Sequence, residues 1–179
     1  MKSKKPRTID VTTLVIRDEA EADLQAVREV NLAAFGRDDE ADLVDALRAG
    51  SHSRVALIAS LGEQVVGHIM FTDLAIVTRS GNVEALALAP VAVAPEFQRR
   101  GIGSALVKEG LNVARVKGSG IVVVLGHPEF YPRFGFSAEL AKRLESPFSG
   151  PAFMAVELIP DTMKNVEGSV RYAPPFGIT

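Results

Sequence analysis

Apolar and polar residues follow two different spacings along the first fifty positions of the chain. β-branched residues between 9 and 16 favour a strand. Between 20 and 35 the apolar residues recur every three or four positions, which predicts an amphipathic helix. A second, shorter helix is expected from 38 to 50, where aspartates suit the start and a glycine suits the end. The chain is therefore expected to begin as strand, helix, helix.

Three strand-like segments follow in the middle of the chain. The runs 54–61 and 65–76 flank the polar connection 62–64, whose length and composition are typical of a hairpin turn. The next run, 83–93, is almost wholly apolar, which indicates a strand that is covered on both faces. We therefore expect 83–93 to be a central strand of the sheet.

The apolar spacing changes to that of a helix at Gly101 and returns to that of a buried strand at 121–125. A strand, a helix and a strand in this order form a β-α-β unit, so the strands 83–93 and 121–125 should be parallel. The weaker signals downstream are a brief helix at 130–134 and late strands at 153–159 and 169–172. Together these patterns predict an α+β, or mixed α/β, fold with a sheet of six or more strands and at least three helices.

Composition narrows the class of protein. A chain of 179 residues that is 47% apolar can bury one core, which predicts a single domain over 9–179 behind a disordered, basic tail over 1–8. A net charge of −2 gives no reason to expect nucleic acid or an anionic membrane as a partner. The chain has no cysteine and no apolar run of about 18 residues, so we expect a cytoplasmic location and no disulfide or cysteine nucleophile.

The clearest chemical signal lies between the central strand and the helix that follows it. Arg99 and Arg100 precede the N-terminus of that helix, where the helix dipole disfavours cations unless an anion is bound. Gly101 and Gly103 add no side chain there, so backbone N–H groups can approach a diphosphate closely. The alternative is that these glycines only allow close packing of the helix on the sheet. A dinucleotide or Walker loop is disfavoured, since Leu106 replaces the third glycine and the Gly-Lys-Ser/Thr end is missing.

The same segment resembles a known family. The run 98–103, Gln-Arg-Arg-Gly-Ile-Gly, matches the Gln/Arg-x-x-Gly-x-Gly/Ala signature of the GNAT superfamily of acetyl-CoA-dependent N-acetyltransferases. The preceding run 90–93 is also similar to that family, and the run 125–136 resembles its YhbS-like subgroup. The resemblance extends from about Val11 to the late strands. It implies a central, mixed, twisted sheet of six to seven strands, flanked by about four helices, with splayed central strands.

Pro90 interrupts the hydrogen-bond ladder of the central strand, which predicts a bulge or splay there. In the family such a slot holds the pantetheine arm of acetyl-CoA, and the resemblance implies that the backbone of Val91 and Val93 pairs with it. An N–H near Ala92 or Val93 would then polarise the thioester carbonyl. The implied cofactor contacts are Val91, Ala92, Val93, Gln98, Arg99, Arg100, Gly101, Ile102, Gly103 and Ser104.

Attack of an amine on a thioester needs a proton for the departing thiolate and a neutral amine. Tyr131 lies in a Tyr-x-x-x-Gly-Phe setting that the family uses for the acid, and a phenol with its ordinary pKa of about 10 stays protonated at neutral pH. The alternative is that Tyr131 only joins the phenylalanines around it in an aromatic cluster. For the base the sequence leaves Glu84, His127, its neighbour Glu129, or ordered water without a dedicated residue.

The activity that the resemblance implies is transfer of an acetyl group from acetyl-CoA to a primary amine, with a small-molecule acceptor favoured. Acetylation of a protein lysine or N-terminus, and a non-catalytic CoA-binding regulatory module, stay open as alternatives. Family members are often homodimers and commonly wall the acceptor pocket with the region corresponding to 35–39, and both features carry over as expectations. His52 and His68 share no metal-like spacing with His127, so we expect no metal, and either is a surface or a satisfied core residue.

Overall fold

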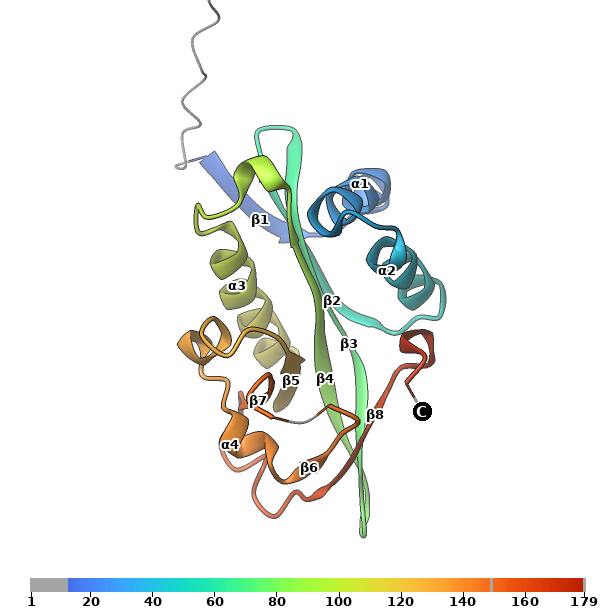
Figure 1. Cartoon of the computed structure of the whole chain (residues 1–179), viewed down its shortest axis with the longest axis vertical. Coiled ribbons are helices and arrows are strands. Elements are labelled where there is room, and N and C mark those ends of the chain that lie inside the picture. The colour runs from blue at the N-terminus through green and yellow to red at the C-terminus, as the bar shows by residue number, and fades with distance from the viewer. Residues whose placement is uncertain (1–12, 149, 179) are drawn as a thin grey trace, which may run out of the picture.

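An eight-stranded mixed sheet runs through the molecule (Figure 1). The computed structural model describes residues 13–148 and 150–178, so the predicted tail 1–8 and the first part of the strand predicted at 9–16 lie outside the described residues. The strands are β1 Leu14–Asp18, β2 Ser53–Leu61, β3 Gln64–Thr78, β4 Gly81–Val93, β5 Ile121–Leu125, β6 Leu144–Glu145, β7 Phe153–Glu157 and β8 Gly168–Tyr172. They lie in the order β1-β2-β3-β4-β5-β7, with β8 paired to β3 and to the short β6.

Helices cover both faces of this sheet, with α3 on one face and α1 and α2 on the other (Figure 1). The α-helices are α1 Leu24–Phe35, α2 Asp39–Ala49, α3 Ile102–Val116 and α4 Ala138–Ala141, and the 3-10 turns are η2 Glu21–Asp23, η3 Pro95–Phe97, η4 Tyr131–Phe134 and η5 Pro174–Phe176. Leu106 of α3 packs in one core cluster with Phe71, whereas Val27 of α1 packs in another with Met70, the neighbour of Phe71 on β3. Within the described ranges, no helix combines the length and apolar character that crossing a membrane requires.

The predicted fold is confirmed, and three details differ. β2 to β5 and α1 to α3 fall on the predicted segments, and β4 pairs with β5 in parallel, as a β-α-β unit requires. The connection between β2 and β3 is shorter than predicted, because Gln64 already pairs with Leu61 and only Gly62 and Glu63 remain in the turn. The last part of the strand predicted at 153–159 is not strand, because β7 ends at Glu157. The sheet has eight strands, in line with the six or more that the pattern predicts and one beyond the six to seven that the resemblance implies, since β6 is too short to show a hydrophobic period.

The two edges of β4 are paired very differently. β4 pairs with β3 along its whole length, apart from a register shift next to Pro90. With β5 it pairs only at Leu86 and Ala87. Beyond Ala87 the two strands separate, although β5 continues to Leu125 and β4 continues to Val93. The bulge and the splay predicted around Pro90 are therefore confirmed, and they leave the last residues of β4 with an open edge.

Candidate active site

The loop between β4 and α3 turns tightly before the helix begins. Arg99 (φ 61°) and Gly101 (φ 83°) both have left-handed backbone angles, which glycine adopts without strain and other residues adopt rarely. Gly101 is the N-cap, and its carbonyl accepts the N–H of Ala105, the first such bond of α3. The N–H groups of residues 102–104 therefore have no partner within the helix.

The protein itself does not neutralise the partial positive charge at the N-terminus of α3. No acidic residue lies in its first turn, and no side chain caps it. The positive end of the helix dipole and the unpaired N–H groups of 102–104 are therefore available to a bound anion. Arg99 adds a positive charge from the exposed loop. This arrangement fits a phosphate or diphosphate group.

A cavity of about 420 Å³ opens in front of this N-terminus, and we refer to it as the glycine-loop cavity. Of the predicted cofactor residues, Val93 and 98–104 line it, with the exception of Arg100. The Arg100 guanidinium lies 5.6 Å from the Phe97 ring centroid instead. A Cβ on Gly103 would meet only the Val93 side chain, at 3.8 Å, and one on Gly101 would meet nothing within 4 Å. The two glycines therefore leave open space, which excludes the alternative that they serve only close packing.

The backbone of β4 alternates between β3 and the open edge. Ala92 pairs with His68 of β3, and two positions further on the N–H of Ala94 donates to the carbonyl of Val66 (2.9 Å). In an antiparallel ladder, every second residue turns its N–H and C=O toward the neighbouring strand. Ala92 and Ala94 therefore face β3, and the residues between them face away from it.

The residues that face the open edge are Val91 and Val93. The side chain of Gln98 supports this orientation, because its Nε2 donates to the carbonyl of Val93 (2.9 Å). Of the two N–H groups expected near the thioester carbonyl, that of Val93 faces the slot between β4 and β5, whereas that of Ala92 faces β3. The geometry therefore favours Val93 as the oxyanion donor.

Tyr131 lies near the end of β5, where β4 and β5 separate. Its ring packs so closely over Gly126, the residue after β5, that a Cβ at 126 would lie 2.2 Å from it. The ring also makes edge-to-face contacts with Phe130 and Phe136, at centroid distances of 5.0 and 5.6 Å. Burial raises the pKa of Tyr131 to about 12. Tyr131 is therefore part of an aromatic cluster, and the cluster fixes the position of its ring. Its phenol stays protonated at neutral pH, and the hydroxyl has no hydrogen-bond partner among the described residues.

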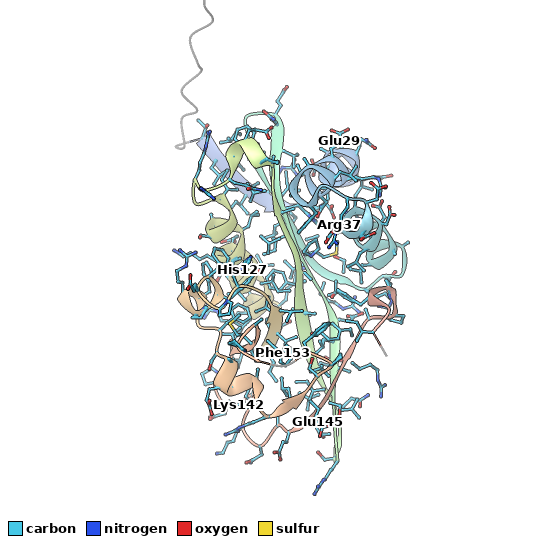
Figure 2. All side chains as sticks on the ribbon, in the orientation of Figure 1. Glu29, Arg37, His127, Lys142, Glu145 and Phe153 are labelled. Atoms are coloured by element: carbon cyan, nitrogen blue, oxygen red, sulfur yellow. The ribbon has the colours of Figure 1, made fainter. Side chains whose placement is uncertain are left out.

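The two main candidates for the base lie in different places. Glu84 is exposed on the first half of β4, seven residues before Val91, which is roughly 23 Å along an extended strand. It lines a separate cavity of about 920 Å³ that also includes Lys117. His127 is exposed after β5, on the α3 side of the sheet (Figure 2), and its carbonyl accepts the N–H of Tyr131 (3.4 Å). The structure brings His127 to the Tyr131 segment and leaves Glu84 apart.

Three residues for which the sequence predicts no role also line the glycine-loop cavity. They are Phe97, within the loop itself, and Phe130 and Arg133, from the Tyr131 segment. Phe130 and Arg133 also line a neighbouring cavity of about 430 Å³ together with His127 and Glu129. The only sequence signal for them is their place beside Tyr131 in the aromatic motif. Their position opposite a loop about thirty residues earlier in the chain depends on tertiary packing.

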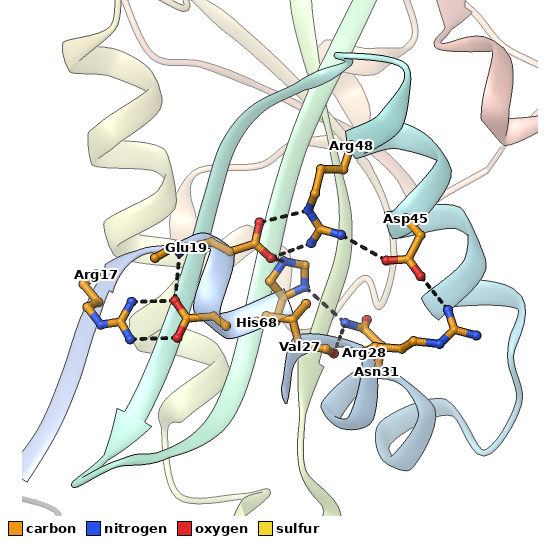
Figure 3. A network of polar contacts seen from close by, with 10 residues as sticks. Arg17, Glu19, Val27, Arg28, Asn31, Asp45, Arg48 and His68 are labelled. Carbon is orange, nitrogen blue, oxygen red and sulfur yellow. Dashed lines mark hydrogen bonds and ion pairs between the residues drawn. The ribbon is translucent and has the colours of Figure 1, made fainter. Parts of the chain in front are cut away.

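A network of charged and polar side chains lies under α1 and α2, on the other face of the sheet (Figure 3). Arg48 forms ion pairs with Glu19 and Asp45. His68 is completely buried beside this network, where its Nδ1 accepts a hydrogen bond from Asn31 Nδ2 (3.2 Å). Its Nε2 lies 3.8 Å from Glu19 Oε1, beyond hydrogen-bond distance, and has no hydrogen-bond partner among the described residues. Burial, with a smaller contribution from Arg48, lowers the pKa of His68 to about 3. His68 is therefore a neutral core residue, with one ring nitrogen unsatisfied.

We expect the stability of the fold to fall with acid because of His68. The unfolded chain takes up a proton at His68 near its ordinary pKa of about 6.5, whereas the folded chain does so only near 3. The contribution of neutral His68 to the free energy of unfolding is fully present above pH 6.5. It is lost as the pH falls toward 3, at about 1.4 kcal/mol per pH unit. His68→Gln should therefore show a shallower fall in unfolding free energy between pH 6 and 4.5 than the wild type, as measured by urea titration.

An exposed histidine provides the control for that experiment. His127→Gln makes the same histidine-to-glutamine change at a solvent-accessible position, and is the matched control for the substitution. Equal slopes for His68→Gln and the wild type would contradict a neutral, buried His68.

The fold and the glycine-loop cavity together have the features expected of an acetyl-CoA-dependent N-acetyltransferase. The sequence matches the acetyltransferase (GNAT) domain over residues 15–138, so the chain belongs to the GNAT family of acetyltransferases. Across the described ranges, no group of three or more histidine, cysteine or carboxylate side chains is arranged to hold a metal ion.

Two Escherichia coli proteins, both described as uncharacterized N-acetyltransferases, are similar in sequence. YjhQ is 39% identical over 131 residues, which cover 72% of this chain and 71% of that protein. YhbS is 31% identical over 166 residues, which cover 91% of this chain and 98% of that protein.

Two solved structures are similar to the whole fold. Escherichia coli YhbS in complex with CoA has a TM-score of 0.85 and 29% identity, covering 98% of this chain and 96% of that one. A GNAT acetyltransferase from Brucella melitensis in complex with acetyl-CoA has a TM-score of 0.77 and 33% identity, covering 91% of this chain and 97% of that one.

Proposed function

We propose that the chain transfers the acetyl group of acetyl-CoA directly to a primary amine of a small molecule. The observation that carries this proposal is the splay between β4 and β5, which opens beside the unpaired N–H groups at the start of α3. Coenzyme A fits both features, since its pantetheine arm is extended and its diphosphate is anionic. The similar structures that contain CoA and acetyl-CoA support the same cofactor here.

The cofactor is held mainly by backbone groups. The N–H groups of 102–104 donate to the diphosphate, and Arg99 supplies positive charge from the loop. The pantetheine arm lies along the open edge of β4, where it pairs with Val91 and Val93 in place of a neighbouring strand. Gln98 holds the loop to the strand through the Val93 carbonyl, so the two parts of the site keep one relative position.

The reaction joins nitrogen to carbon and breaks the carbon–sulfur bond. The neutral amine attacks the thioester carbonyl, whose developing oxyanion receives a hydrogen bond from the N–H of Val93. As the tetrahedral intermediate collapses, the thiolate leaves and takes the phenolic proton of Tyr131, which regains a proton from solvent. The amine gives up its proton to His127, directly or through water, because His127 adjoins the Tyr131 segment and Glu84 does not.

The acceptor side is assigned to the loop between α1 and α2. Residues 35–37 are exposed there, and Arg37 pairs with Glu40 at the start of α2. Figure 2 places Arg37 and His127 on opposite sides of the β4 ribbon. A homodimer and a cytoplasmic location stay predictions.

A panel of amines tests the proposed activity. Amino sugars, polyamines and amino acid derivatives are each mixed with acetyl-CoA and enzyme, and free CoA is measured with a thiol reagent. We expect release of CoA to depend on at least one small amine. Saturable binding of acetyl-CoA without release to any small amine, but with release to peptides, would favour protein acetylation. Binding without any release would favour a regulatory module, and no binding at millimolar acetyl-CoA would rule out the proposed function.

A further inference from the structure

Arg133 is a cation that the fold holds in place and that has no carboxylate partner among the described residues. It lies in η4, and its side chain is exposed. Its Nε donates to the carbonyl of Phe130 (3.2 Å), and the two terminal nitrogens of the guanidinium have no acceptor within residues 13–148 and 150–178. Arg28, Arg37 and Arg48, by contrast, each form ion pairs with carboxylates.

Two aromatic rings fix the orientation of this guanidinium. Its central carbon lies 4.6 Å from the ring centroid of Phe130 and 5.7 Å from that of Phe134. The two rings pack against each other at a centroid distance of 5.1 Å. Stacking of this kind holds a guanidinium by its faces and leaves its N–H edge available. The fold therefore fixes the guanidinium of Arg133, while its terminal N–H groups form no hydrogen bond to a described residue.

Arg133 belongs to the lining of the anion site. Arg133 and Phe130 line the glycine-loop cavity together with residues 101–104. Arg133 also lines the neighbouring cavity of about 430 Å³, which contains His127. Arg133 therefore lies where the two cavities share lining residues. Positive charge reaches the glycine-loop cavity from two segments far apart in sequence, through Arg99 and through Arg133.

We propose that Arg133 binds a phosphate group of the acyl-CoA and is the second half of the phosphate site, opposite the N-terminus of α3. The proposal rests on the proposed function, since it names a contact within the same cofactor site. Its geometric basis is a planar guanidinium, which matches phosphate oxygens in pairs. Coenzyme A offers two such groups, the diphosphate and the 3′-phosphate, and the experiment separates them.

The test measures the binding of CoA and of dephospho-CoA, which lacks the 3′-phosphate, to the full chain by calorimetry. Arg133→Ala should weaken CoA binding about 10- to 100-fold, the loss typical of hydrogen bonds to a charged group. Arg133→Lys keeps the charge without the planar fork and should recover part of the loss. Arg115→Ala removes another exposed arginine, on the last turn of α3, and should bind CoA like the wild type.

Each outcome bears on the proposal. If Arg133→Ala weakens CoA binding but not dephospho-CoA binding, the partner is the 3′-phosphate, and if it weakens both by the same factor, the partner is the diphosphate. If Arg133→Ala and Arg115→Ala bind CoA within twofold of each other, the proposal is wrong and the acetyltransferase function is untouched. If the wild type itself fails to bind CoA, the proposed function fails instead. Equal melting temperatures of the two variants show that folding is not the cause.

Discussion

Gly103→Leu is expected to weaken CoA binding strongly without unfolding the protein. The position lies within α3, where leucine is a good helix former, and its Cβ would meet only the Val93 side chain, at 3.8 Å. The rest of the leucine side chain would fill the glycine-loop cavity, where the diphosphate is proposed to bind. We expect the Kd for CoA to rise at least about 100-fold, or about 2.7 kcal/mol, in calorimetry.

Gly103→Ala is the matched control for this substitution. A single methyl group leaves most of the cavity open, so CoA binding should persist with a modest loss of affinity. The melting temperatures of both variants should stay close to that of the wild type, because neither side chain enters the packed core. If the leucine variant bound CoA as well as the alanine variant does, the diphosphate would have to lie elsewhere.

Tyr131→Phe should lower kcat about 100-fold or more and leave the Kd for acetyl-CoA nearly unchanged. The ring keeps its contacts with Phe130 and Phe136, so the substitution removes only the proton donor. Because the pKa of Tyr131 is raised to about 12, the active, protonated form persists across the neutral range and is lost only as the pH rises toward 12. Single-turnover release of free CoA measures the effect.

A second tyrosine with the same property provides the control. Burial also raises the pKa of Tyr172 to about 12, but its ring packs against Phe148 and Phe176, away from the Tyr131 cluster. Tyr172→Phe should therefore keep the wild-type rate. Equal rates for Tyr131→Phe and the wild type would remove Tyr131 from the mechanism.

Features encoded by neighbouring residues could be predicted from the sequence. The glycine loop is one case, because two arginines directly before a helix start are unfavourable unless an anion binds there. The splay is another case. The almost wholly apolar run predicts a central strand, and Pro90 has no N–H to donate to the hydrogen-bond ladder of that strand. Both inferences depend on a few adjacent positions and on backbone chemistry that does not change with the fold.

Features that depend on tertiary distance could not be predicted. Glu84 and Val91 lie on one strand, yet the extended backbone separates them by roughly 23 Å, so a shared strand does not make a shared site. Arg133 reaches the glycine-loop cavity only because η4 folds back beside α3. The sequence does not decide whether His68 is a surface or a core residue, because its burial depends on α1 covering that face of the sheet.

The narrow pairing of β4 with β5 divides the sheet mechanically. Among the described strands, β5 and β7 are joined to the remaining strands by ladder bonds only at Leu86 and Ala87. A cofactor bound in the proposed slot would lie between β4 and β5 and would form backbone hydrogen bonds with β4. A ligand that binds only the closed form stabilises it, so bound acetyl-CoA should hold the two parts of the sheet together. We therefore expect the ligand-free protein to open locally at this seam and to be cleaved faster by proteases. Acetyl-CoA would therefore act as a structural component of the protein as well as its substrate.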